Sequence, residues 1–431
     1  MGAEITTYLK EHKLYPLQLK NQVSQHLGCI VVIPCYNECG LLQTLQSLYD
    51  CHRPEKIVEV IVVINSAEFD TDEVISNNQN AYWEAEDWAS KRNNDQIKFY
   101  FLNLISISSD IAGVGLARKI GMDEALARFD KANNPEGVIV SLDADCSVSK
   151  NYLQEIEQWF DNNRDKEAAS LYYEFPQNGN EDQRIFEAAA RFELSGRYIA
   201  EGLRYAQFPF AFETHGFAFA VRAKAYLMAG GMSKRKSQES FYFLSNLTHQ
   251  LSYGTIQTLC VYPKARKSVR VPKGSAYQIS EWLKQKNENW PVYHPDAFSN
   301  LRTFTGQIKE LYQIESLNDY NHFIMSLPPA IIAYLSESSF YEQWQELQVS
   351  ALDETDFQQQ FYKRFNRIWV ESYLIASHDT FYKKISVVDA YCKICGLISG
   401  LEIKNKTLSD CLVMARNRQT KTYSIRQKVA S

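Results

Sequence analysis

Two acidic residues stand two positions apart where an apolar run ends. Residues 137–142 read Gly-Val-Ile-Val-Ser-Leu, and an Asp-x-Asp motif formed by Asp143 and Asp145 follows them. On an extended backbone, side chains at positions i and i+2 point to the same side, so both carboxylates face one way. Two such anions are costly unless a cation or hydrogen-bond donors compensate them. Because Mg2+ and Mn2+ prefer oxygen ligands and bridge to substrate phosphates, the pair is a candidate metal site, with a solvated loop as the alternative.

An aromatic residue and a glutamate follow another apolar run near the start of the chain. Pro34 ends that run, and Tyr36 and Glu38 come directly after it. A ring lying against a base, with polar groups at the base edge, would form one wall of a nucleobase pocket. An ordinary strand-to-helix turn with Asn37 as the helix N-cap explains the same residues. Asn65, where the next apolar run closes, is also suited to hydrogen-bond the edge of a base.

Strand-like runs alternate with helical periodicity, and these elements would position the residues above. We expect strands at residues 29–33, 57–64, 97–102, 137–142 and 168–173. We expect helices over about 41–48, 70–91 and 114–129. Repeated strand–helix–strand units predict an α/β fold with an open, mostly parallel sheet flanked by helices. Such sheets bind ligands at the carboxyl ends of their strands, which is where the candidate residues lie.

The second half of the chain has a different character. Strand signals vanish after about residue 278, and helical periodicity takes over in segments 341–352, 357–369 and 387–401. We therefore expect three regions. They are an N-terminal helical extension (1–27), the α/β domain (28–277) and a mostly helical C-terminal appendage (278–431).

The composition argues against several classes of protein. The chain has 431 residues, of which 45% are hydrophobic and 23% charged, as in ordinary folded proteins. A net charge of −5 without a long basic run argues against nucleic-acid binding. No apolar stretch reaches the roughly 20 residues that span a bilayer. Nine scattered cysteines, and an amino terminus without the apolar core of a secretory signal, favour a cytoplasmic protein with reduced thiols.

Three motifs, in order along the chain, resemble glycosyltransferase family 2. They are Val-Ile-Pro-Cys-Tyr-Asn-Glu at 32–38, Leu-Asp-Ala-Asp-Cys at 142–146, and the segment 215–222 that leads to Gly-Gly-Met at 230–232. The resemblance spans residues 28–270. It implies the GT-A fold and transfer from a nucleotide-diphosphate sugar with inversion at the anomeric carbon.

A further segment looks like the family's Ala-Arg-Asn-x-Gly helix start. Residues 114–121 read Val-Gly-Leu-Ala-Arg-Lys-Ile-Gly. The resemblance implies that Arg118 lies near the phosphates of the sugar donor. An exposed helical arginine is the alternative.

The resemblance also implies a set of binding residues. The nucleoside pocket would be lined by Pro34, Tyr36, Glu38 and Asn65. Asp143 would contact the ribose or the metal, and Asp145 would bind the Mn2+ or Mg2+ that bridges the diphosphate. An acceptor hydroxyl would attack the opposite face of the sugar, helped by a carboxylate base.

These roles define expected partners. We expect a UDP-sugar as donor in preference to a GDP-sugar, and a glycan or lipid-linked acceptor that is assembled for the cell surface. A protein without a membrane anchor would meet a lipid-linked acceptor through peripheral contact with the inner face of the membrane.

The expected catalytic base departs from the family pattern. The family carries Glu-Asp at a helix start after the Gly-Gly turn, with the Asp as base, whereas Glu239 and Ser240 stand there in this chain. A serine hydroxyl does not accept a proton at neutral pH as a carboxylate does. Glu239 or another acid such as Glu213 is then the base, or the protein is a catalytically impaired relative that binds nucleotide sugar or glycan. A one-residue shift that aligns Gln238 and Glu239 with Glu-Asp restores the acid but spoils the match of the following aromatic residues.

A sugar nucleotidyltransferase is a third alternative, because such enzymes also use a nucleotide-binding α/β sheet. They require a glycine-rich, basic phosphate loop straight after the first strand. Residues 32–38 contain neither a glycine nor a basic residue, so this alternative ranks far behind.

Overall fold

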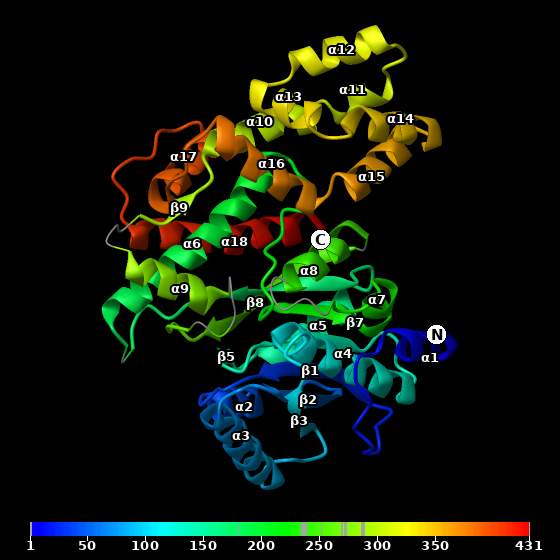
Figure 1. Ribbon diagram of the computed structural model, residues 1–431, viewed down its shortest axis with the longest axis vertical. Helices are drawn as coiled ribbons and strands as arrows, with labels where there is room; N and C mark the ends of the chain where they lie inside the picture. Colours follow the sequence, from blue (N-terminus) through cyan, green and yellow to red (C-terminus); the bar gives the residue numbers. More distant parts are fainter. Residues whose placement is uncertain are drawn as a thin grey trace. The chain divides into compact units, whose positions relative to one another are not determined.

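The computed structural model of the chain describes residues 2–179, 181–233, 239–250, 252–268, 270, 274–285 and 289–430 (Figure 1). The chain divides into two compact units. Unit 1 contains residues 1–186 and 214–281, and unit 2 contains residues 187–213 and 282–431. The boundaries of these two units differ from those of the three regions expected from the sequence, so the three regions stay predictions.

Unit 1 is built on one eight-stranded sheet with the order β3-β2-β1-β4-β7-β6-β8-β5 (Figure 1). Its strands are β1 (Leu27–Cys35), β2 (Ile57–Ala67), β3 (Ile97–Ile107), β4 (Val138–Ser141), β5 (Cys146–Val148), β6 (Ala168–Tyr173), β7 (Phe219–Arg222) and β8 (Tyr253–Pro263). Strands β3, β2, β1 and β4 run parallel, while β7 is antiparallel to both β4 and β6. The five strands expected from apolar runs are all present. The predicted open sheet flanked by helices, as in the GT-A fold, is therefore confirmed.

The helices of unit 1 cover faces of the sheet that the strand order determines. They are α1 (Gly2–His12), α2 (Leu41–Tyr49), α3 (Asp72–Ser90), α4 (Val114–Lys131), α5 (Tyr152–Asn162), α7 (Ala223–Met228) and α8 (Glu239–Gln250). From β1 to β3 the chain steps one way along the sheet, and from β3 to β4 it steps back. Because crossovers between parallel strands are right-handed, α3 and α4 cover opposite faces. This explains why every residue of β1 is buried.

Helix α4 lies unusually close to the sheet at Gly121. A Cβ atom added there would lie 2.4 Å from Cγ1 of Val32 and 3.1 Å from Cγ2 of Val63. A side chain at this position would force the helix away from β1 and β2. The glycine therefore lets the N-terminal half of α4, which carries Arg118, approach the carboxyl ends of the central strands.

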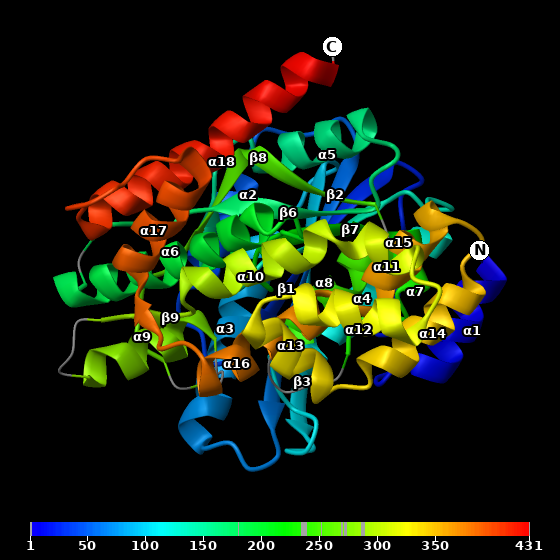
Figure 2. The same ribbon diagram turned by 90° about the horizontal axis from the view of Figure 1, so that it is seen from above.

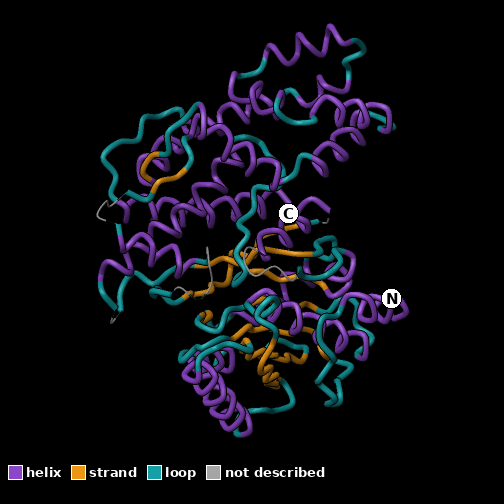
Figure 3. Tube along the Cα trace, in the orientation of Figure 1, coloured by secondary structure: helices purple, strands orange, loops and turns teal. Residues whose placement is uncertain are grey.

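Unit 2 is almost entirely helical (Figures 2 and 3). Its C-terminal helices are α10 (Pro295–Gly306), α11 (Ile308–Tyr312), α12 (Leu317–Ser326), α13 (Pro329–Ser336), α14 (Phe340–Ser350), α15 (Glu354–Arg364), α16 (Arg367–Thr380), α17 (Val387–Ser399) and α18 (Leu408–Ala430). Helices α6 (Gln183–Tyr205) and α9 (Ser275–Lys284) each begin in unit 1 and end in unit 2. Two short antiparallel strands, β9 (Pro291–Val292) and β10 (Ile385–Ser386), complete the unit. The helical character expected for the C-terminal region is confirmed.

One expected helical segment, 357–369, is in fact two helices. Helix α15 ends at Arg364, and α16 begins at Arg367. Between them, Oδ1 of Asn366 accepts hydrogen bonds from the backbone N–H groups of Ile368 at 2.9 Å and Trp369 at 3.4 Å. An asparagine that caps a new helix stops the previous one, even though apolar residues recur at helical spacing across the junction.

No helix in the described ranges combines the length and apolar character needed to cross a bilayer.

Candidate functional site

Arg118 lies at the centre of a buried polar network at the carboxyl end of β4. Its side chain is 2% exposed, and its Nε donates to Oγ of Ser141 at 2.9 Å. Its other nitrogens donate to Oδ1 of Asp143 at 2.7 Å, to Oγ of Ser240 at 3.0 Å and to the Glu239 carboxylate. The alternative of an exposed helical arginine is therefore wrong. The network joins the N-terminal half of α4, the end of β4 and the start of α8.

The two carboxylates of the Asp-x-Asp motif each have a guanidinium partner. Asp143 pairs with Arg118, whereas Oδ2 of Asp145 accepts from Nε of Arg266 at 2.7 Å. Desolvation raises the pKa of the Asp143 carboxyl, the nearby Asp145 and Glu239 carboxylates raise it further, and Arg118 opposes them. Both carboxylates of the motif are thus ion-paired, with 34% of the Asp143 side chain and 17% of the Asp145 side chain exposed. The motif belongs to an extended set of fixed charges.

Two arginines after β8 bind the loop that follows β1. Glu38 is 6% exposed and pairs with Arg266 at 3.0 Å and with Arg270 at 2.9 Å. Arg270 also donates to the backbone oxygens of Tyr36, at 2.8 Å, and Asn37. Arg266 therefore bridges Glu38 and Asp145. The sequence analysis missed both arginines. Recognising β8 as a strand would have identified them, because they follow its end as the other candidate residues follow theirs.

The loop after β1 is not a simple helix cap. Asn37 has a φ of 48°, and helix α2 begins four residues later, with Gly40 at its N-cap position. The backbone N–H of Asn37 donates to Oδ1 of Asn78 at 2.7 Å. Pro34, the first candidate residue, is buried in β1 opposite Val63. The interpretation of Asn37 as the N-cap is therefore wrong.

Tyr36 is fixed by an aspartate from the loop after β2. Its hydroxyl donates to Oδ1 of Asp70 at 2.8 Å, and Oδ2 of the same carboxylate accepts from the N–H of Ala67 at 2.7 Å. Burial and the Asp70 carboxylate raise the pKa of Tyr36 to about 12. The ring is thereby held at the carboxyl ends of β1 and β2.

Asn65, near the end of β2, has an unused acceptor. The residue is 2% exposed, and its Nδ2 donates to the backbone oxygen of Gly113 at 3.5 Å. Its buried Oδ1 hydrogen-bonds to none of the residues that the structure describes. Leaving a buried acceptor unpaired costs about 1–3 kcal/mol. Such a position suits a ligand that brings its own donor.

The acids present suit a divalent cation bound together with a substrate. Among the described residues, no cluster of three or more His, Cys, Asp or Glu side chains could hold a metal ion. Asp143 and Asp145 supply oxygen ligands only. Mg2+ is commonly bound by one or two carboxylates, with substrate phosphates and water as the other ligands. The residues therefore fit a cation that arrives with a diphosphate, and they do not form a closed protein site.

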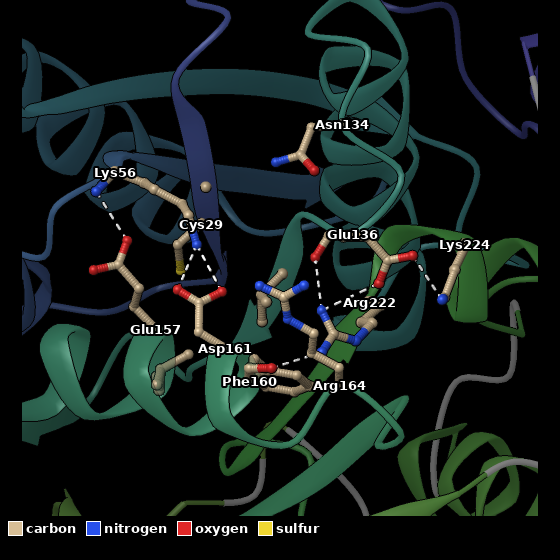
Figure 4. Close-up of a pocket in the computed structure, with 13 residues that line it drawn as sticks. Cys29, Lys56, Asn134, Glu136, Glu157, Phe160, Asp161, Arg164, Arg222 and Lys224 are labelled. Carbon is tan, nitrogen blue, oxygen red and sulfur yellow. Dashed lines mark hydrogen bonds and ion pairs between the residues drawn. The ribbon is translucent and has the colours of Figure 1, made fainter.

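A cavity of about 470 Å3 lies at the amino ends of β1 and β4, the opposite edge of the sheet (Figure 4). Its charged side chains largely neutralise one another. Lys56 pairs with Asp161 at 2.6 Å, and Glu136 pairs with Arg222 at 3.3 Å and with Lys224 at 2.6 Å. No candidate site residue lines this cavity. It is therefore separate from the network around Arg118.

Comparison with known proteins gives a family match. Residues 30–226 match the family model described as glycosyl transferase family 2. That segment contains Arg118, Asp143 and Asp145, and it ends before Glu239 and Arg266. No curated protein matches the chain.

Two solved structures illustrate the similarity. The structure of S. aureus TarS 1–349 in complex with UDP-GlcNAc is 14% identical, with a TM-score of 0.41, over 82% of this chain and 91% of that chain. The mannosyltransferase PcManGT from Pyrobaculum calidifontis, in complex with GDP-Man and Mn2+, is 15% identical, with a TM-score of 0.35, over 88% of this chain and 94% of that chain.

Proposed function

We propose that the protein is a member of glycosyltransferase family 2, whose family model matches residues 30–226, and that it transfers a sugar from a UDP-sugar to an acceptor hydroxyl with inversion. The observation that carries the proposal is the network around Arg118. It joins Arg118 to Asp143 and to the adjacent pair Glu239 and Ser240, which come from three segments that are far apart in the sequence. Buried charges gathered at the carboxyl ends of parallel strands favour a site for a charged substrate.

The nucleoside would bind beside β1 and β2. Pro34, Tyr36 and Glu38 stand at the end of β1, and Asn65 stands near the end of β2. We keep uridine as the expected nucleoside, and the unpaired Oδ1 of Asn65 would accept from the N3–H group of uracil. Pairing this oxygen with the base would recover the cost of burying it alone.

The diphosphate would bind between the Asp-x-Asp motif and the arginines. Asp143 and Asp145 would hold Mn2+ or Mg2+, which when bound neutralises charge that grows on the departing nucleoside diphosphate. Arg118 and Arg266 lie next to these carboxylates and add fixed positive charge. An acceptor hydroxyl would then attack the opposite face of the sugar and release its proton to a base.

We assign the base to Glu239, with Ser240 orienting it. Oγ of Ser240 donates to Oε1 of Glu239 at 2.8 Å, and the Glu239 carboxylate is 5% exposed. The other acid considered, Glu213, belongs to unit 2, where Gln419 donates to it. Glu239 would accept the proton of the acceptor hydroxyl only after Arg118 turns toward the donor, because the Arg118 guanidinium is hydrogen-bonded to its carboxylate in the structure.

That same ion pair favours the second candidate function. If Arg118 keeps Glu239 paired, the chain would bind nucleotide sugar or glycan with little or no transfer. The acceptor in either case would be a glycan or lipid-linked sugar assembled for the cell surface, reached by peripheral contact with the membrane.

Calorimetric titration with UDP and GDP, each with and without Mn2+, tests the donor site. We expect UDP to bind more tightly than GDP, and binding to weaken strongly without Mn2+ or in Asp145→Ala. Asp161→Ala is the matched control, because Asp161 is a half-exposed acid of the same unit that pairs with Lys56. Absence of binding by both nucleotides would overturn the proposal.

Transfer assays with UDP-sugars then separate the two functions. If Glu239 is the base, Glu239→Gln should lower turnover by about 100-fold or more. If the base has been lost, wild-type turnover is near background and Ser240→Asp should raise it. Normal turnover in Glu239→Gln would contradict the assignment of the base.

A further inference from the structure

Helix α1 places one tyrosine inside unit 1. Ile5 and Tyr8 are its buried residues, with 2% and 5% exposed. The Tyr8 hydroxyl donates to Oδ1 of Asp123 at 3.0 Å and accepts from Nζ of Lys119 at 3.0 Å. Both partners belong to α4 and are themselves buried. The tyrosine thus joins a buried ion pair, Lys119–Asp123, whose closest atoms lie 3.0 Å apart.

The same cluster contacts the turn after α7. The hydroxyl of Tyr226, in α7, also donates to Oδ1 of Asp123, at 2.8 Å. Gly231 has a φ of 74°, and its N–H donates to the backbone oxygen of Tyr226 at 3.0 Å. A Cβ atom at Gly231 would lie 1.7 Å from the Tyr8 hydroxyl oxygen. Tyr8 therefore rests directly on the backbone of the Gly230–Gly231 turn.

Two connections lead from this cluster to the proposed catalytic residues. Lys119 directly follows Arg118 in α4, so the hydrogen bond between Lys119 and Tyr8 also restrains the backbone at Arg118. The ring of Tyr226 lies 5.8 Å, centroid to centroid, from the ring of Phe243, which is buried in α8. Helix α8 begins with Glu239 and Ser240, the partners of Arg118. Tyr8 thus contacts α4 directly and is linked to α8 through Tyr226, whose ring lies beside both Tyr8 and Phe243.

We propose that Tyr8 is a positioning residue for sugar transfer, which braces the Gly230–Gly231 turn and α4 so that Glu239 and Ser240 meet Arg118. This inference rests on the proposed function. It makes the N-terminal helix part of the apparatus that aligns the base, although the helix contributes no group that touches the substrate. A small misplacement of reacting groups is enough to slow a reaction considerably.

Kinetics of Tyr8→Phe test the proposal, with Ile5→Val as the matched control on the same helix. Tyr8→Phe removes the hydroxyl and keeps the ring, so we expect kcat to fall by about tenfold while the KM for the UDP-sugar and the Kd for UDP change by less than about twofold. Ile5→Val trims the packing of α1 and should leave kcat within about twofold of wild type. Unchanged kcat in Tyr8→Phe, or an equal loss in both variants, would overturn the inference.

Hydrogen exchange provides a readout that does not require activity. If Tyr8 braces the turn, Tyr8→Phe should speed exchange of the Gly231 amide and of amides in α8, while amides of β1 and β2 keep their wild-type rates. An unchanged exchange rate at Gly231 would overturn the inference even in an active enzyme. If wild type transfers no sugar, the proposed function fails, and exchange alone decides whether Tyr8 braces the turn.

A double-mutant cycle checks the contact itself. Gly231→Ala places a methyl group against the Tyr8 hydroxyl, so it should impair turnover in wild type. The same change in a Tyr8→Ala background should cost less, because the clashing phenol is gone. Additive effects of the two substitutions would contradict direct contact.

Discussion

Glu59 is a charged residue near the amino end of a mostly apolar strand. It lies in β2 with 2% of its surface exposed, where an isolated carboxylate would be costly. Arg128 of α4 compensates it, with Nη2 donating to Oε1 at 2.5 Å and Nε donating to Oε2. The guanidinium also lies over the ring of Tyr100, 4.8 Å from its centroid. The pair therefore joins the C-terminal end of α4 to the sheet, whereas Arg118 lies near the N-terminal end of the same helix.

We predict that breaking this pair is more costly than replacing it. Glu59→Gln or Arg128→Met alone should lower the free energy of unfolding by about 3–5 kcal/mol, because each leaves a buried group without its partner. The double variant Glu59→Leu/Arg128→Met should recover much of that loss. Urea unfolding measures all three.

A surface pair provides the control for that experiment. Asp87 and Lys91 lie 2.6 Å apart with well over half of each side chain exposed. Asp87→Ala should therefore cost less than about 1 kcal/mol. If Glu59→Gln also lowered the free energy of unfolding by less than about 1 kcal/mol, the account of the buried pair would be contradicted.

At the scale of the helices and strands, a strand could be predicted from the sequence when it formed a long, mostly apolar run. Strands β1 and β2 are mostly apolar and were expected almost to their ends. Strand β8 was missed because polar residues such as Thr255 and Gln257 interrupt it, and β5 was missed because it has only three residues. The break between α15 and α16 was missed because one capping side chain makes it.

A residue of the candidate site could be predicted when the strand next to it could be predicted. Asp143, Tyr36 and Asn65 follow strands that the sequence reveals, so their gathering at one edge could be inferred. Arg266 follows the missed strand β8, and it was missed too. The contact between Arg118 and Glu239 joins residues 121 positions apart, and nothing local in the sequence encodes it. The roles of all these residues stay predictions.

The cap at Asn366 gives an element-scale prediction. Asn366→Ala removes the acceptor for the first N–H groups of α16 and should lower the free energy of unfolding by about 1 kcal/mol. Asn366→Asp keeps the acceptor and should stay close to wild type. Thermal unfolding compares the two variants, and equal losses would show that the side chain does not act as a cap.

At the scale of the whole molecule, unit 2 combines two distant segments. Helix α6 supplies Glu193, which pairs with Arg197 at 2.8 Å and with Arg416 of α18 at 2.7 Å. The hydroxyl of Tyr198, also in α6, donates to the backbone oxygen of Tyr293 at 2.6 Å. The C-terminal helices therefore pack around a helix that comes from the first half of the chain.

We predict that the chain does not tolerate truncation after residue 281. Removing residues 282–431 would expose the buried side chains of α6, including Phe192 and Tyr198. The truncated protein should bind a hydrophobic dye such as ANS, unfold at a lower temperature and aggregate. Arg416→Met, which removes one ion pair and keeps the helices, should show a smaller decrease in Tm. A monomeric truncated chain with the wild-type Tm would contradict this account.

The distribution of cysteines has a practical consequence. All nine lie in the described part of the chain, and eight are buried, while Cys39 is exposed. Cys39 directly follows Glu38, which Arg266 and Arg270 hold. A maleimide fluorophore added to the folded protein therefore has one accessible attachment point, at the rim of the proposed donor site. The natural sequence thus already contains a position for an optical sensor of nucleotide binding, with no cysteine to remove or introduce.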